Sequence, residues 1–446
     1  MVTTEMNNAY DLNELKKETG MNLKDLIVNS ENNDPFLIRD SKIEMAKWFG
    51  MVWDRYGRKG FHLRSLHYKL TSIKELELWN GEPYENTKYC WDKLNMASRN
   101  ARYYGYVDPL ELHDAKGKHE IYFTPTIPER GINAAGVRCV LPEIDTTCGY
   151  SINNPSVDIY AYNEIKGLQP YLIEIWIEKS SMNSILRPIC DKYGLNLVYG
   201  EGYLSITQTV NFIERVKRSG KAGRVLYITD FDPAGDSMPE KIARQLEWFT
   251  QDTDLDIKLE QIALTKDQVE FYELPPVPLK KKDSKLSGFI EKMGVEFGSE
   301  LDALEALHEG EFKKIVVEAV EKLMDKELFQ KAKEVEKKNE EVLEKVWQGI
   351  RNEHDDEIKE VEELYEEIKE QFIDEMERLE EEMKPFKEKL EAKADELDKK
   401  IFESLNKEMK KVKMFIPKAD KPDFDRWLFD AKRSYLEQLE YYKREK

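Results

Sequence analysis

The chain has 446 residues, of which 40% are hydrophobic and 11% aromatic, so it is long and apolar enough for two or three domains with buried cores. No apolar run approaches the ~18 residues of a membrane-spanning helix, and the first residues lack the pattern of a signal peptide, so we expect a cytoplasmic, nucleoid-associated protein with no membrane partner. The four cysteines have no CxxC spacing, which argues against a zinc cluster or a disulfide framework.

The net charge of −19 comes mainly from one segment. Residues 301–400 hold 19 Lys and Arg against 34 Asp and Glu, which leaves a charge of only −4 for the rest of the chain. Residues 51–100 hold nine basic and six acidic residues. A DNA-binding face outside the acidic segment is therefore compatible with the composition.

After an N-terminal extension over residues 1–34, the segment 35–130 has the pattern of short helices followed by a polar, hairpin-like end. The helical stretches lie at 41–57, 61–72 and 86–105, and the strand-like end is HEIYFTP at 119–125. Three helices and a strand pair predict a winged-helix module that binds double-stranded DNA.

The third of these helices has one apolar and one polar side. Its apolar positions recur at helical spacing and should face a core: Trp91, Leu94, Ala97, Ala101 and Tyr104. Its polar positions lie on the opposite side: Lys88, Asn95, Arg99 and Arg102. We interpret Lys88, Arg99 and Arg102 as candidate contacts to DNA phosphates, with an ordinary solvated helix surface as the alternative.

Residues 131–168 are interpreted as an irregular connector, after which the hydrophobic period changes. Strand-like runs lie at 171–178, 195–200, 224–230 and 255–264, and helix-like segments lie between them at 181–194, 206–220 and 237–249. Alternating strands and helices predict an α/β domain with a parallel sheet over residues 169–310.

A sustained apolar seam follows in the acidic segment. It comprises Leu328, Ala332, Val335, Asn339, Val342, Val346, Ile350, Val361, Tyr365, Ile368, Phe372, Met376, Leu379, Met383, Phe386 and Leu390. Spacings of three and four predict a coiled coil over residues 311–412, either folded back on itself at Gly349 with Asn352 or at Pro385, or intermolecular. The last residues, 413–446, regain aromatic side chains and are predicted to dock on a surface.

Acidic residues follow two of the predicted strands. Glu178 ends the first strand, and Asp230 and Asp232 end the third. Functional groups collect at the carboxyl ends of parallel strands, so the three carboxylates should converge if these strands are neighbours. Such hard oxygen ligands suit Mg²⁺ or Mn²⁺, which would remove their mutual repulsion. The alternative is a solvated loop or a helix N-cap, for which Asp236 is also a candidate.

A further acidic pair, Glu300 and Asp302, precedes the coiled-coil segment. It either adds acidic groups near the metal site or caps a helix, and we favour the cap.

Three motifs in this order resemble the Toprim domain of the topoisomerase VI A subunit and of the meiotic double-strand-break transesterases. They are Glu178 followed by Lys179, GEGYLSIT at 200–207, and DFDPAGD at 230–236. Two positions depart from the family pattern, because Leu204 stands where the family has proline and Ala234 where it has tyrosine.

The resemblance implies that Glu178, Asp230 and Asp232 bind Mg²⁺ or Mn²⁺ in a Toprim domain. Lys179, next to this site, is a further candidate DNA contact.

The helix at 61–72 carries a second point of resemblance. Arg64 and Tyr68 lie four residues apart on the side opposite Leu63, Leu66 and Leu70, as in the RxxxY motif of the winged-helix domain in the same family. The resemblance implies that Tyr68 attacks DNA while Arg64 holds a phosphate, and a half-buried structural tyrosine is the alternative. His67 lies on the apolar side and is expected to be packed rather than catalytic.

The resemblance implies a DNA-cleaving enzyme that forms a 5′-phosphotyrosyl link, acting as a homodimer with one cut per strand. The first alternative is a Toprim nuclease in which Tyr68 is only structural, in a plasmid-defence or chromosome-maintenance complex. The second is a non-catalytic DNA-binding coiled-coil scaffold. The chain contains no GxxxxGK[ST] motif, so an ATPase or another complex partner would be a separate protein, docked on the coiled coil.

Overall fold

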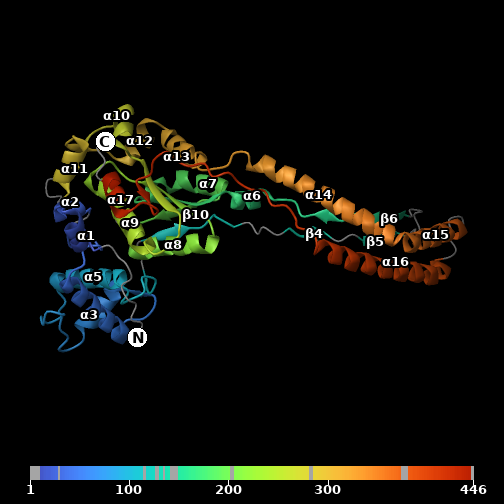
Figure 1. Ribbon diagram of the computed structural model, residues 1–446, viewed down its shortest axis with the longest axis horizontal. Coiled ribbons are helices and arrows are strands. Elements are labelled where there is room, and N and C mark those ends of the chain that lie inside the picture. Colours follow the sequence, from blue (N-terminus) through green and yellow to red (C-terminus); the bar gives the residue numbers. More distant parts are fainter. Residues whose placement is uncertain are drawn as a thin grey trace. The chain divides into compact units, whose positions relative to one another are not determined.

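The computed structural model describes residues 11–28, 31–113, 117–125, 130–133, 136–140, 149–200, 205–280, 285–372 and 380–442. The chain is mixed α/β and divides into two compact units (Figure 1). The first unit comprises Met1–Thr124, Gln169–Asp325 and Lys421–Lys446. The second unit comprises Pro125–Leu168 and Lys326–Asp420. The sequence of the second unit therefore interrupts that of the first at two places.

The first helices of the chain pack around an aromatic core. They are α1 (Leu12–Thr19), α2 (Leu23–Leu26), α3 (Asp40–Tyr56), α4 (Leu63–Thr71) and α5 (Lys88–Tyr103), with β1 (Phe61–His62) paired in parallel with β2 (Leu112–His113). The predicted apolar face of α5 is confirmed, because Leu94, Ala97, Ala101 and Tyr104 are buried and Trp91 is partly buried against them.

The strand expected in HEIYFTP forms over Lys118–Glu120 as β3, but it does not belong to a hairpin of the helical module. It pairs antiparallel with β9 (Asn196–Tyr199) at the edge of the large sheet. The assignment of this segment to a winged-helix hairpin is therefore wrong. The reason is tertiary: Phe123 is buried in the core of the large sheet, and the carboxylate of Glu120 accepts hydrogen bonds from Arg187 at 2.7–3.0 Å.

A six-stranded sheet with the order β14-β11-β10-β8-β9-β3 forms the centre of the first unit. Its remaining strands are β8 (Tyr171–Ile177), β10 (Ala222–Ile228), β11 (Ile257–Ala263) and β14 (Phe429–Asp430). The four predicted strands, β8 to β11, are confirmed and run parallel. The two edge strands, β3 and β14, are antiparallel to their neighbours, so the sheet is mixed.

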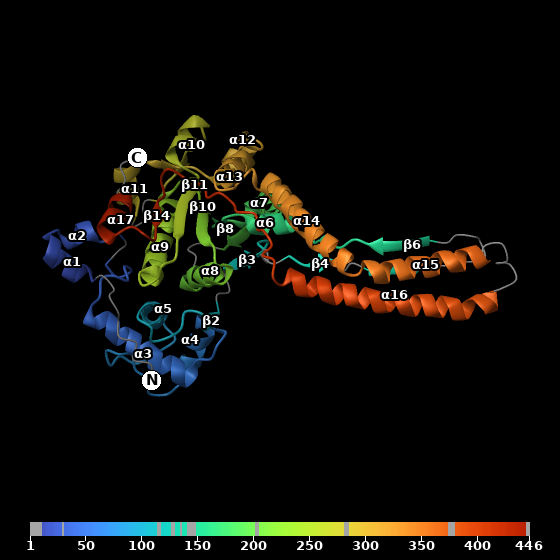
Figure 2. The ribbon, with the colours of Figure 1, turned by 45° about the vertical axis from the view of Figure 1, so that its right-hand side comes forward.

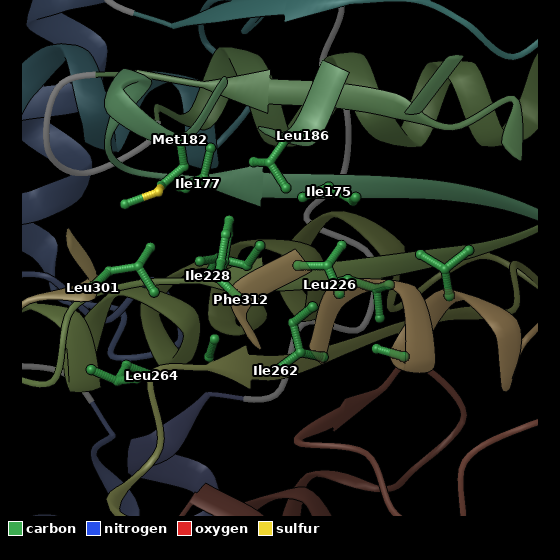
Figure 3. Packing of buried hydrophobic residues seen from close by; sticks show 14 of the residues in the cluster. Ile175, Ile177, Met182, Leu186, Leu226, Ile228, Ile262, Leu264, Leu301 and Phe312 are labelled. Atoms are coloured by element: carbon green, nitrogen blue, oxygen red, sulfur yellow. The ribbon is translucent and has the colours of Figure 1, made fainter. Parts of the chain in front are cut away.

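Both faces of this sheet are buried, and the alternation along the strands decides which residues face which layer. On one face, Ile175, Leu226 and Ile228 pack with α7 (Asn183–Tyr193) and with later helices that contribute Leu301 and Phe312 (Figure 3). On the other face, Trp176 and Tyr227 pack with residues of α8 (Ile206–Ser219) and α9 (Pro233–Thr250). All three predicted crossover helices are therefore confirmed.

The rest of the first unit is made of short helices and strands, some of which pack on the sheet face that carries α7. It consists of the 3₁₀ helix η1 (Ser180–Met182), α10 (Lys266–Phe271), β12 (Val277–Pro278), α11 (Leu286–Met293), β13 (Phe297–Gly298), α12 (Leu301–Leu307), α13 (Glu311–Glu321) and α17 (Tyr435–Tyr442). The aromatic side chains Trp427 and Phe429 are buried, and Phe429 pairs with β11. The C-terminal segment thus docks on the sheet of its own chain.

The second unit is built on three helices, α14 (Leu328–Glu353), α15 (Asp355–Phe372) and α16 (Glu380–Met409). Figures 1 and 2 show α14 and α15 continuing in one direction and α16 returning beside them. Contacts along the pair agree with this antiparallel course. The side-chain amide of Asn339 donates to the backbone oxygen of Phe415 and accepts from its backbone N–H. Further along, His354 is hydrogen-bonded to Ser404, and Glu360 forms an ion pair with Lys393.

The buried residues of these helices differ in part from the predicted seam. In α14, Leu343 and Trp347 are buried, whereas the predicted Val342 and Val346 are only partly buried. Side chains of neighbouring β-strands pack in the same cluster, so a second side of α14 is shielded from solvent. Phe386, expected in the seam, is 38% exposed. The predicted seam residues Met376 and Leu379 lie outside the described residues, as do the side chains of Phe372 and Met383.

The predicted hairpin tip at Gly349 with Asn352 is wrong, since α14 continues through both residues and ends at Glu353, and α16 runs antiparallel only after α15. Pro385 lies within α16. None of the described helices combines the length and apolar character needed to cross a membrane.

The expected irregular connector contains regular structure. β5 (Gly136–Val140) pairs antiparallel with β6 (Gly149–Asn153), β4 (Ile132–Asn133) pairs with β7 (Ser156–Val157), and α6 (Tyr162–Leu168) follows. Val137 and Val157 are buried against α14 and α16, and Asp398 accepts a hydrogen bond from the backbone of Val137. The interpretation of 131–168 as irregular is therefore wrong, because these short strands are stabilised by the helices that follow much later in the sequence.

Candidate functional site

The predicted carboxylates meet at one edge of the sheet. Glu178 follows β8 directly, and Asp230 and Asp232 follow β10 within four residues. β8 and β10 are adjacent and parallel, with Ile177 opposite Ile228. The condition for the carboxylates to converge is therefore met, and the charges of both aspartates act on Glu178.

The turn after β10 is shaped by its proline and glycine. Asp232 is the N-cap of α9, and its Oδ1 accepts a hydrogen bond of 2.6 Å from the backbone N–H of Gly235. Pro233 occupies the first helical turn, where its missing N–H costs nothing. A Cβ atom at Gly235 would lie 2.0 Å from the carbonyl oxygen of Asp230, so only glycine fits here. Asp232 therefore fixes the turn through one oxygen and keeps the other for a further partner.

Asp236, considered above as a helix cap, has a different role. Its carboxylate pairs with the ammonium of Lys292 on α11 at 2.8 Å, and Glu240 pairs with the same ammonium. This ion pair ties α11 to α9 and leaves the cap to Asp232.

Asp230 is held from two directions. Its Oδ1 accepts a 2.8 Å hydrogen bond from the backbone N–H of Leu301, the first residue of α12, and its Oδ2 lies 2.8 Å from the Nζ of Lys179. Lys179 also pairs with Glu300 and, at 3.2 Å, with Asp302. The preferred interpretation of Glu300 and Asp302 as a cap is wrong, because the side chain of Glu300 makes no capping hydrogen bond. Both carboxylates instead pair with Lys179 and so lie near Asp230.

Burial opposes ionisation of two carboxylates in this cluster, Glu178 and Asp230. Burial raises the pKa of Glu178, and the charges of Asp230 and Asp232 raise it further. Burial also raises the pKa of Asp230, against the opposing effects of the Leu301 N–H and Lys179. Three carboxylates, Asp230, Glu300 and Asp302, thus pair with one ammonium, and Glu178 and Asp232 add further acidic groups beside them.

The donor chemistry of this cluster fits a divalent cation, although its present arrangement is not that of a formed site. In the part of the chain that the structure describes, no three His, Cys, Asp or Glu side chains are placed as a ready set of metal ligands. Both carboxylate oxygens of Asp230 are engaged, Oδ2 by Lys179 and Oδ1 by the Leu301 N–H. Glu178, Asp230 and Asp232 are the residues that could hold Mg²⁺ or Mn²⁺ once Oδ2 of Asp230 is released.

No protein-family model matches this chain, and no curated protein is similar to it. We therefore infer the chemistry of the site from its own side chains. Of the motif at 200–207, residues 201–204, including Leu204, lie outside the described residues.

The candidate nucleophile lies on the surface of α4. Tyr68 is 58% exposed, and Arg64, one turn earlier, is exposed with its guanidinium 5.7 Å from the centre of the Trp91 ring. The interpretation of Tyr68 as half-buried and structural is therefore not supported by its exposure. His67 is buried and bonds the hydroxyl of Tyr84 at 2.7 Å, as expected for a packed residue.

The predicted DNA contacts differ in how accessible they are. Lys88 is exposed at the start of α5. The guanidinium of Arg99 donates to the backbone oxygen of Asn32 and to Asn33, and burial lowers its pKa. Arg102 donates to the backbone oxygen of Ser98 at 3.2 Å, and Lys179 is engaged by carboxylates. Among these four, only Lys88 is fully presented to solvent.

The raised pKa of Glu178 has a consequence for stability. A carboxyl group whose pKa is higher in the folded protein than its ordinary value of 4.5 destabilises the fold increasingly as the pH rises through that interval. In metal-free buffer at neutral pH, Glu178→Gln should therefore raise the unfolding temperature, and the gain should disappear below about pH 4. Thermal unfolding from about pH 4 to pH 8 in chelator measures this.

Glu291→Gln, at an exposed glutamate of α11, is the control and should change little at any pH. A Glu178→Gln protein that is less stable than wild type at neutral pH would contradict the expected repulsion.

Proposed function

We propose that this protein is a Mg²⁺- or Mn²⁺-dependent DNA-cleaving enzyme of the Toprim class, which breaks both strands by tyrosine transesterification as a homodimer. The observation that carries the proposal is the meeting of Glu178, Asp230 and Asp232 at the carboxyl ends of two adjacent parallel strands. Hard oxygen donors at this edge of an α/β sheet favour phosphoryl transfer assisted by a divalent ion. Exposed Tyr68 with Arg64 one turn away supplies a nucleophile and a phosphate contact.

In this proposal α3 to α5 act as a helical DNA-binding module without the expected wing, and the six-stranded sheet is the Toprim domain. The antiparallel helices α14, α15 and α16 then form a coiled-coil hairpin within one chain. Its acidic, solvated exterior suits docking of a separate ATPase or another complex partner rather than contact with DNA.

The chemistry assigns one role to each residue. The ion, bound by Glu178, Asp230 and Asp232, would withdraw charge from the scissile phosphate. The phenol oxygen of Tyr68 attacks the phosphorus and loses its proton to solvent, and a phosphotyrosyl bond to the 5′ end forms. The bond from phosphorus to the 3′ oxygen breaks, and this oxygen takes a proton from solvent and leaves as a hydroxyl. The guanidinium of Arg64 stabilises the charge that develops on the phosphate oxygens. Because the bond energy is retained in the new ester, the step is reversible.

A second function is favoured by Glu178. Its half-buried carboxyl, with a raised pKa and no hydrogen bond to any residue that the structure describes, has the properties of a general base for water. With Glu178 activating water, the protein would be a metal-dependent nuclease, and Tyr68 would have no part in the reaction.

The proposal is tested by incubating the purified full-length protein with supercoiled plasmid and Mg²⁺ or Mn²⁺, then quenching with detergent. We expect nicked and linear DNA from wild type. Asp230→Asn should reduce cleavage by at least about a hundredfold, the scale seen when one electrostatic group of a catalytic site is removed. Glu291→Gln should cleave as wild type does. Intact plasmid with wild type under all metal conditions, or full cleavage by Asp230→Asn, would refute the proposal.

A further inference from the structure

The ammonium of Lys179 is bound to an oxygen of Asp230 that a metal ion at this site would need as a ligand. Its ammonium lies 2.8 Å from Oδ2 of Asp230, whose side chain is only 9% exposed. The other oxygen, Oδ1, already accepts the N–H of Leu301 at the start of α12. Oδ2 is therefore the one oxygen of Asp230 that is exchangeable without disturbing the backbone, and the ammonium and a metal ion compete for it.

The same ammonium has a second set of partners that do not belong to the strand ends. Glu300 and Asp302 flank Leu301, and their side chains are 48% and 51% exposed. The Lys179 side chain itself is 30% exposed, and a lysine has a flexible four-carbon stem. Lys179 can therefore give up Asp230 and keep its ion pairs with Glu300 and Asp302.

The charge balance gives Lys179 a role in the metal-free protein. Burial raises the pKa of Glu178, the charges of Asp230 and Asp232 raise it further, and Lys179 supplies a cation that acts against both effects. Hydrogen bonds to Asp230 and Glu300 raise the pKa of Lys179 although burial opposes them, so the lysine stays charged.

We propose that Lys179 is an internal counter-cation that closes the metal site: it holds Oδ2 of Asp230 in the metal-free protein and moves onto Glu300 and Asp302 when a divalent ion binds. Lys179 thereby lowers metal affinity and stabilises the metal-free fold. This inference rests on the metal site of the proposed function. It replaces the expectation that Lys179 contacts DNA.

Mn²⁺ titration of the full-length protein by calorimetry tests this role. Lys179→Met keeps most of the apolar stem and removes the charge, so it should bind Mn²⁺ about tenfold more tightly or better, because one competing ion pair is lost. The same variant should unfold at a lower temperature than wild type in chelator and gain more from added Mn²⁺. Lys179→Arg should stay close to wild type in both measurements.

Lys292→Met is the matched control, because Lys292 also pairs with two carboxylates, Asp236 and Glu240. Both lie on α9, the helix that follows Asp230 and Asp232. It should lose stability without a change in Mn²⁺ affinity. If Lys292→Met tightens Mn²⁺ binding as much as Lys179→Met does, the effect comes from the lost positive charge alone and not from the contact with Asp230, and the proposal is overturned. Unchanged or weaker Mn²⁺ binding by Lys179→Met overturns it as well.

The movement itself is tested by a double substitution, Glu300→Gln with Asp302→Asn. Without these two carboxylates, Lys179 has no other ion pair within the described residues to keep when it releases Asp230. The double substitution should therefore weaken Mn²⁺ binding in the wild-type background and have no effect in the Lys179→Met background. Equal weakening in both backgrounds would mean that Glu300 and Asp302 serve the ion directly and would sink the proposal. Failure of wild type to bind Mn²⁺ at all would instead refute the metal site on which the proposal rests.

Discussion

Replacing Arg244 with alanine is expected to lower the free energy of unfolding of the first unit by about 3–5 kcal/mol, the cost of leaving buried charges without their partner. Arg244 lies on α9 and is 1% exposed. Its guanidinium pairs with the fully buried Asp34 at 2.8 Å and with Glu247 at 2.6 Å, and it donates to the hydroxyl of Tyr435 at 3.2 Å.

These contacts join three distant parts of the sequence. Asp34 precedes the first long helix, Arg244 belongs to the sheet layer, and Tyr435 belongs to the C-terminal helix α17 and donates to the backbone oxygen of Leu26. The rings of Phe36 and Tyr435 also cover the guanidinium, at 4.2 and 4.7 Å from the ring centres. Burial raises the pKa of Glu247 even with Arg244 beside it, so loss of the arginine would leave two carboxyl groups in a site that opposes their charge.

Urea denaturation at neutral pH followed by circular dichroism measures the effect. The double variant Arg244→Ala with Asp34→Asn should be more stable than Arg244→Ala alone, because the unpaired charge is then removed as well. Lys217→Ala, in the exposed pair with Glu214, is the surface control and should cost less than about 1 kcal/mol. A loss below about 1 kcal/mol for Arg244→Ala would show that the network is not needed for stability.

The part of the fold that depends on local pattern could be predicted from the sequence. The four parallel strands and their crossover helices have strong periodicity and clear turn residues, and the glycine and proline of the turn after β10 place Asp230 at a strand end. The rule that carboxyl ends of parallel strands share an edge predicted where the carboxylates lie, but the adjacency of β8 and β10 was only a condition of that prediction, and the sheet order supplies it.

The parts that were missed depend on contacts between residues far apart in the sequence. The edge strand β14 has two residues, which is too short for an alternation of apolar and polar side chains to reveal a strand, so its pairing with β11 could not be predicted. The hairpin β5 and β6 is stabilised by α14 and α16. The ion pairs of Lys179 with Glu300 and Asp302 span more than 120 residues. Charge alone gave no signal for this pairing, because many acidic residues surround each lysine in the sequence.

Arg99 shows why a polar helix face is a weak guide to function. The helical spacing of α5 correctly placed Arg99 opposite the apolar side. Its guanidinium nevertheless donates to the side-chain oxygen of Asn33 and to the backbone oxygen of Asn32, in the segment that precedes α3. Lys88, without such a loop over it, is exposed.

The substitution that separates transesterase from nuclease is Tyr68→Phe. It removes one hydroxyl from a side chain that is 58% exposed, so the free energy of unfolding should change by less than about 0.5 kcal/mol. Covalent attachment of protein to DNA should fall by at least about a thousandfold, the scale expected when a nucleophile is removed. The assay is detergent-quenched plasmid cleavage in Mn²⁺, with attached protein detected at the labelled 5′ ends.

Tyr106→Phe is the matched control, because Tyr106 lies in the same unit and is 40% exposed, and it should leave attachment unchanged. If Tyr68→Phe cleaves as well as wild type and neither protein is found on 5′ ends, the reaction is hydrolysis, and Glu178 becomes the residue that activates water. Attachment that survives in Tyr68→Phe would assign the nucleophile to another side chain. In each case Asp230 and Asp232 remain the proposed metal ligands, since both reactions need the phosphate charge to be neutralised at the same place.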